Sequence, residues 1–133
     1  MSVWEDLDVE AAILEALGAV PINNPDGHHF GRPFMTAYQL ALAVDANHPE
    51  IAQTLGVSVG GRGAGARNSL AQYLARELSH RIHRSPERFP VQGAFISNVH
   101  LTALVYESSD DQSVTSSLTG TGYDLSMFRL RPE

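Results

Sequence analysis

The sequence contains no cysteine, no lysine and no apolar run long enough to cross a bilayer. Without cysteine there can be no disulfides, thiolate metal sites or cysteine nucleophiles, and the chain suits a reducing compartment. The first six residues carry no positive charge ahead of an apolar stretch, so a secretion signal is not expected. We therefore expect a cytoplasmic protein.

Charge is also sparse, because charged residues make up 18% of the 133 residues while hydrophobic residues make up 43%. This balance is typical of an ordinary folded domain rather than of a disordered or membrane chain. A chain of this length can bury a sufficient core without help from a metal or a disulfide. We expect a single domain over residues 1–133.

Motifs of the common enzyme classes are missing. No Gly-x-Ser-x-Gly elbow presents a nucleophile. The glycine-rich run at 60–65 precedes a helix, where exposed backbone amides can hold a phosphate. However, no lysine follows it at Walker A spacing, and the third glycine of a dinucleotide fingerprint is absent. We expect no enzyme and no cofactor, and phosphate or nucleotide binding at this run is our third hypothesis.

Histidines raise the question of a metal site. His28 and His29 are adjacent, and His80 and His83 lie one helical turn apart, a spacing at which two imidazoles can share a zinc ion. The sequence brings no third ligand to either pair, so it predicts no metal site.

Positive charge is concentrated in one segment of an acidic chain. Residues 62–88 contain six arginines and two glutamates, a local net charge of +4, although the whole chain carries −6. The remaining residues therefore carry −10 together. An anionic partner would bind at this segment.

Three capping boxes predict helix starts, because a serine or threonine is followed three residues later by glutamate or glutamine at Ser2, Thr36 and Ser69. Pro49 predicts a further short helix, and Gly18 and Gly56 predict helix ends. Apolar residues at three- and four-residue steps give each segment a buried stripe. The stripes comprise Trp4, Leu7, Ala11, Leu14 and Leu17; Leu40, Ala41 and Val44; Ile51, Ala52 and Leu55; and Leu70, Leu74, Leu78 and Ile82.

The last third of the chain has an amino-acid composition typical of β-strands. Residues 99–106 are rich in residues that suit a pleated surface, and 114–118 and 123–130 are expected to return as strands. Residues 21–33 contain several turn formers and are expected to form a loop. Together these patterns predict an α+β fold in which three to four helices are followed by a small antiparallel β-sheet.

The segment Glu50-Ile-Ala-Gln-Thr-Leu-Gly-Val-Ser58 resembles the first helix and turn of a helix-turn-helix, where alanine permits close packing and glycine a sharp turn. The order of elements over residues 36–106, with strands after the helices, resembles the winged-helix variant. In that family the DNA-recognition helix starts almost directly after the turn, whereas in this chain residues 59–68 lie between the turn and the next helix.

The resemblance implies a non-enzymatic nucleic-acid-binding module, with a role in transcription regulation and a homodimer as its expected form. Gln72, Arg76, His80 and His83 would face the groove, since arginine and glutamine make paired hydrogen bonds to base edges. Arg62 and Arg67 would meet phosphates, and the interface would extend to Arg84. Our alternative is a protein-interaction or adaptor domain whose arginine-bearing face docks an acidic protein partner.

Overall fold

The computed structural model describes residues 2–22, 30–60, 69–108, 113–116 and 124–132. Within these residues, five helices and five strands follow in the order α1, α2, β1, α3, α4, α5, β2, β3, β4, β5. The strands form an antiparallel three-stranded sheet and a separate two-stranded one. The predicted α+β fold class is confirmed, with one short strand lying among the helices rather than after them.

The N-terminal segment forms two helices, α1 (Val3–Asp6) and α2 (Val9–Gly18), where one was predicted. The Ser2 hydroxyl accepts a hydrogen bond from the Glu5 amide at 3.3 Å, as the capping pattern indicated. The break is at Asp8, whose φ of 51° is in the left-handed region that aspartate tolerates better than most residues. In α2, Ala11 is exposed, contrary to prediction, whereas Leu17 is buried as predicted. The other buried residues of α2 are Val9, Ala12, Ile13 and Ala16.

Helix α3 (Ala37–Asn47) starts as predicted. Its Thr36 cap makes both bonds of a capping box, accepting from the Gln39 amide at 3.3 Å while the Gln39 side chain accepts from the Thr36 amide at 2.7 Å. Helix α4 (Glu50–Leu55) ends at Gly56, whose φ is 70°. Both helix boundaries therefore follow from local sequence chemistry.

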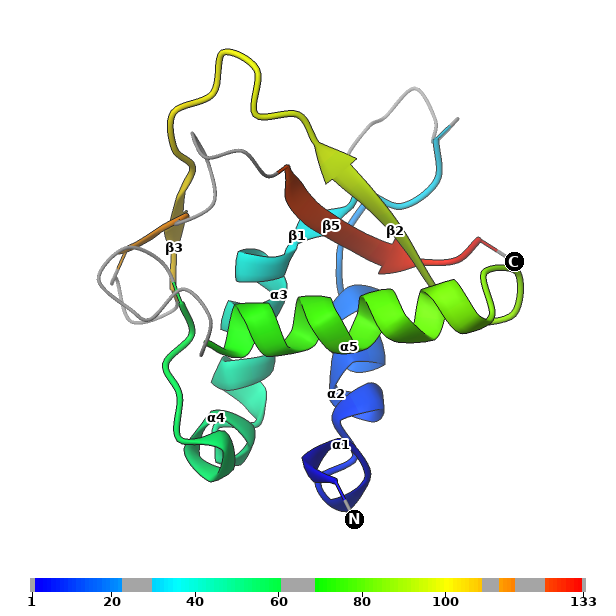
Figure 1. Cartoon of the computed structure of the whole chain (residues 1–133), viewed down its shortest axis with the longest axis vertical. Coiled ribbons are helices and arrows are strands. Elements are labelled where there is room, and N and C mark those ends of the chain that lie inside the picture. Colours follow the sequence, from blue (N-terminus) through cyan, green and yellow to red (C-terminus); the bar gives the residue numbers. More distant parts are fainter. Residues whose placement is uncertain (1, 23–29, 61–68, 109–112, 117–123, 133) are drawn as a thin grey trace.

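Helix α5 (Leu70–Arg84) is the longest, and Ser69 caps it by accepting from the Gln72 amide at 3.1 Å. Its Leu70, Leu74 and Leu78 are fully buried against the remaining core. Figure 1 shows α5 crossing in front of α2 and α3, with the three-stranded sheet along its other long side. The helix thus packs against α3 and against β2 of the sheet, while α2 and α3 also contact the sheet directly.

The three-stranded sheet has the order β1 (Met35–Thr36), β5 (Leu125–Leu130), β2 (Val91–Ile96). Strands β2 and β5 pair from Val91 opposite Leu130 to Ile96 opposite Leu125. Two more strands, β3 (Val105–Glu107) and β4 (Ser113–Thr115), form the second sheet. The long connection between β2 and β5 therefore carries its own small hairpin.

The predicted strand over residues 99–106 is largely wrong, because only its last two residues belong to a strand and His100 has a φ of 62°. Strand β2 was not predicted at all. Its Gly93 and Ala94 have low strand propensity, and pairing with β5 overrides that preference. The expected strands at 114–118 and 123–130 are confirmed in part by β4 and β5; residues 117–123 lie outside the described residues.

Candidate nucleic-acid interface

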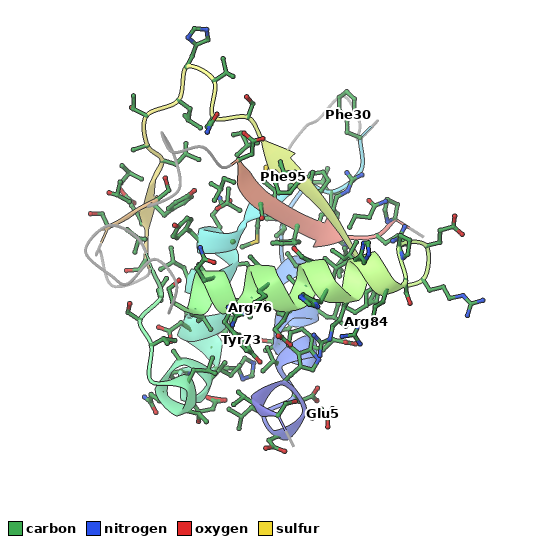
Figure 2. The ribbon with its side chains drawn as sticks, viewed as in Figure 1. Glu5, Phe30, Tyr73, Arg76, Arg84 and Phe95 are labelled. Carbon is green, nitrogen blue, oxygen red and sulfur yellow. The ribbon has the colours of Figure 1, made fainter. Side chains whose placement is uncertain are left out.

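One face of α5 points to solvent and carries basic and polar side chains. Arg76, His80 and His83 are exposed, on the side of the helix opposite Leu74 and Leu78. We call these three residues, with Arg84, the α5 ridge. Figure 2 shows Arg76 and Arg84 on α5, and their separation of eight positions corresponds to about 12 Å of helix.

The arginines of the ridge form no salt bridge with a carboxylate of the described residues. Within the described part of the chain, no ion pair involves Arg76 or Arg84. Arg88 is likewise exposed without an ion pair to any described residue, in the turn that follows the helix. These guanidinium groups therefore remain available to an external anion.

Arg81 behaves differently, although it belongs to the same charged segment. Its Nη1 lies 2.8 Å from the Glu77 Oε1, and its guanidinium stacks over the Trp4 ring with 3.8 Å between the guanidinium carbon and the ring centroid. The charge is thus compensated within the chain and turned toward α1. The pair is neutral as a unit, so it leaves the local net charge of +4 unchanged but removes Arg81 from the cations that an external partner meets.

Three arginines outside the segment are bound to backbone oxygens. Arg32 donates to the carbonyls of Gly18 and Val20, and Arg129 donates to that of Arg32. Arg131 donates to the Phe89 carbonyl at 2.9 Å. These contacts tie chain segments together.

The predicted site residues divide into three groups. Arg76, His80, His83 and Arg84 lie on the ridge, while Gln72 is half-buried and borders a small cavity of about 80 Å³ with Ala75 and Ser126. Gln72 therefore lies at the sheet-facing edge of the helix. Arg62 and Arg67 are outside the described residues, as are most of the glycine-rich run and the His28–His29 pair.

The described ends of the insertion between α4 and α5 lie side by side. Ser58 and Ser69 form a parallel β-bridge, and the first amides of α5 donate to the carbonyls of Ser58 and Val59 at 2.8 and 2.9 Å. The chain before the insertion and the chain after it are therefore neighbours in the fold. Despite the insertion, α5 starts next to the chain that follows the Gly56 turn.

A cleft beside the ridge was missed by the sequence analysis. It has a volume of about 570 Å³ and lies between α5 and the β2–β5 pair, with His83 and Phe95 among its lining residues. The available signals were Gly93, an isolated glycine within an apolar stretch, and Phe95, which is 70% exposed. Without a prediction of β2, neither could be placed next to α5.

Titratable groups near α5 show one clear effect. Burial raises the pKa of Tyr73, and the Glu77 carboxylate raises it further, whereas Arg81 and Arg76 act in the opposite direction. Among the described residues, no three histidine, aspartate or glutamate side chains are grouped as a metal site requires. The same residues contain no helix long and apolar enough to cross a membrane.

Comparison of the chain with family models, curated proteins and solved structures finds no match. A functional assignment therefore depends on the side chains that α5 presents and on the arrangement of the surrounding elements.

Proposed function

We propose that this protein is a non-enzymatic nucleic-acid-binding module with a regulatory role, and that α5 is the element that enters the groove. The observation that carries the proposal is the α5 ridge, where Arg76 and Arg84 are exposed and unpaired among the described residues. Arginine is the side chain best suited to both guanine edges and phosphates.

The order of elements supports this proposal. Helices α3, α4 and α5 are followed by the antiparallel strands β2 and β5, as in the winged-helix arrangement that the sequence resembles. The bridge between Ser58 and Ser69 places the start of α5 close to the Gly56 turn. The insertion therefore does not separate the proposed recognition helix from that turn. A helix of 15 residues extends about 22 Å, enough to contact several base pairs in a major groove.

The acidic remainder of the molecule favours one orientation of binding. The chain carries −6 overall, so surfaces away from the ridge repel a polyanion. A duplex can therefore approach only with its groove toward α5, and the affinity should depend steeply on salt. A homodimer would place two α5 helices on half-sites about 34 Å apart and would strengthen a weak single contact.

The test is fluorescence anisotropy with labelled duplex DNA and, separately, single-stranded DNA and RNA, from about 50 to 200 mM salt. We expect binding that weakens steeply across this range. Arg76→Gln should cost about 1 to 3 kcal/mol if the side chain contacts a base, and it should lower the salt slope by about 1 if it contacts a phosphate.

Arg88→Gln is the matched control, because it removes the same charge from an exposed arginine outside α5. Equal losses in the two variants would mean that only general charge matters, and no binding to any probe at the lowest salt would refute the proposal. Binding of a polyglutamate peptide at the ridge, without nucleic-acid binding, would instead favour the adaptor hypothesis with an acidic protein partner. Phosphate binding at residues 60–65 is a separate hypothesis that these variants do not address.

A further inference from the structure

The cleft beside the ridge is apolar on most of its surface and has a few polar groups, which come from both α5 and β5. With a volume of about 570 Å³, it falls in the range of small-molecule sites. Ile82, Phe95 and Phe128 provide apolar surface, and hydroxyls and an imidazole come from Ser79, Ser126 and His83. In Figure 2 Phe95 lies on β2, on the sheet side of α5.

The cleft is open because Gly93 contributes no side chain to it. A Cβ atom at this position would lie 3.4 Å from Ile82 Cδ1 and 3.6 Å from Phe128 Cε1, so even one carbon would reach both walls. Phe95, two residues further along the same face of β2, is 70% exposed and leaves a large aromatic surface uncovered. The surface of the sheet is therefore hollow at Gly93, and the exposed ring of Phe95 lies beside this hollow.

A second cavity, of about 370 Å³, adjoins the cleft and shares Ile82, Pro86 and Gly93 with it. It adds two cations, Arg129 and Arg131, together with the ring of Phe34 and the amide of Gln92. The shared residues place the two cavities next to each other at β2, the edge strand of the sheet, so a ligand that spans both passes around this edge to the arginines.

The two arginines are held in place and keep their charge. Arg129 Nε donates to Gln92 Oε1 at 3.0 Å, and its guanidinium lies over Phe34 with 4.4 Å to the ring centroid. Arg131 Nε donates to the Phe89 carbonyl at 2.9 Å. Neither has a carboxylate partner among the described residues. Their positive charge is therefore pre-positioned without being neutralised.

We propose that the two adjoining cavities form one binding site for a small organic anion with an apolar body, best represented by an arylalkyl carboxylate. The aromatic body lies between Phe95, Ile82 and Phe128, and the carboxylate reaches Arg129 and Arg131. This charge complementarity selects the anion over a neutral molecule of the same shape. The site stands independently of nucleic-acid binding.

The test uses the full chain and 4-phenylbutyrate as the probe, with isothermal titration calorimetry and the melting temperature as readouts. We expect saturable binding and a melting temperature that rises with ligand concentration. The neutral amide of the probe lacks the charge, and acetate and inorganic phosphate lack the apolar body. Each should bind at least about tenfold more weakly than the probe.

Two variants locate the site. Gly93→Val fills the gap shared by both cavities and should weaken binding at least about tenfold, while its circular dichroism spectrum stays unchanged. Arg131→Gln should weaken binding of the carboxylate and leave binding of the amide unchanged. The matched control Arg88→Gln removes an exposed charge that lines neither cavity and should leave both affinities unchanged.

Three outcomes would overturn the proposal: no detectable binding of the probe, an amide that binds as tightly as the carboxylate, or acetate and phosphate that match the probe. If Gly93→Val does not fold, Gly93→Ala gives the same information, because its single added carbon contacts Ile82 and Phe128 at ordinary distances. Unchanged affinity in a folded Gly93 variant would place the ligand elsewhere and also overturn the proposal.

Discussion

The two flanks of α5 differ in how far their side chains are covered or paired within the protein. On the flank toward α1, Arg81 is paired with Glu77 and stacked over Trp4, a ring that is 6% exposed. On the flank toward β2, Phe95 is 70% exposed and Gly93 leaves a gap. We call these the closed flank and the open flank. Groups on the closed flank contact one another within the fold, whereas Phe95 on the open flank and the side chains of the ridge are exposed to solvent.

The largest expected contrast is between the two aromatic residues. Trp4→Ala should lower the free energy of unfolding by about 3 to 5 kcal/mol, because it leaves a cavity and removes the ring under Arg81. Phe95→Ala should cost less than about 1 kcal/mol, since the ring is mostly in water already. Urea denaturation at neutral pH measures both. Equal losses would mean that Phe95 is covered in solution and that the open flank does not exist.

A smaller effect is expected for the charges of the closed flank. A double-mutant cycle with Glu77→Gln and Arg81→Gln should give a coupling energy of about 0.3 to 0.5 kcal/mol, typical of a partly exposed pair on one helix. Added salt should reduce it. Arg81→Gln alone should cost more than Glu77→Gln alone, because it also removes the contact with Trp4.

Arg76 gives the control for this cycle. It is next to Glu77 in sequence but exposed on the ridge, and no ion pair joins the two in the described structure. The cycle of Glu77→Gln with Arg76→Gln should therefore show coupling near zero. A coupling as large as that of Arg81 would indicate a general charge effect on α5 and would remove the distinction between ridge and closed flank.

The helices could be predicted because their determinants are local. Thr36 and Gln39 satisfy each other's backbone within one turn, and Leu70, Leu74 and Leu78 repeat at the helical period. The start of α3 and the buried stripe of α5 therefore followed from the sequence alone. Asp8 was the exception, since its left-handed backbone divides the predicted first helix and no glycine or proline in the sequence marked this break.

The sheet and the cleft could not be predicted, because they depend on pairing between distant residues. Gly93 lies opposite Phe128 only because β2 and β5 align from Val91 to Ile96. Its neighbour Ala94 is no stronger a strand former. The exposed face of α5 was predicted in part: Arg76 and His80 are exposed as expected, but the pairing of Arg81 with Glu77 was not anticipated. The four-residue spacing of Glu77 and Arg81 was the signal that could have shown it.

The smallest effect concerns the closed flank at alkaline pH. Because burial and Glu77 raise the pKa of Tyr73, the folded state holds its phenolic proton at a pH where the unfolded state has lost it. The contribution of Tyr73 to the free energy of unfolding is therefore fully present below about pH 10, the ordinary pKa of tyrosine, and is lost as the pH rises above it. Burial also raises the pKa of Tyr106, so both tyrosines contribute to the decline of the free energy of unfolding at alkaline pH.

Tyr73→Phe should leave the free energy of unfolding nearly unchanged near pH 8 and reduce its decline above about pH 10. Urea denaturation across this range measures the decline, and NMR titration of the Tyr73 phenol gives the pKa directly. Glu77→Gln should lower that pKa without restoring the ordinary value, because the contribution of burial remains. A Tyr73 that titrates at or below the ordinary value would show that Glu77 and the surrounding atoms do not enclose it. Water would then reach the part of the closed flank that surrounds Tyr73 and Arg81.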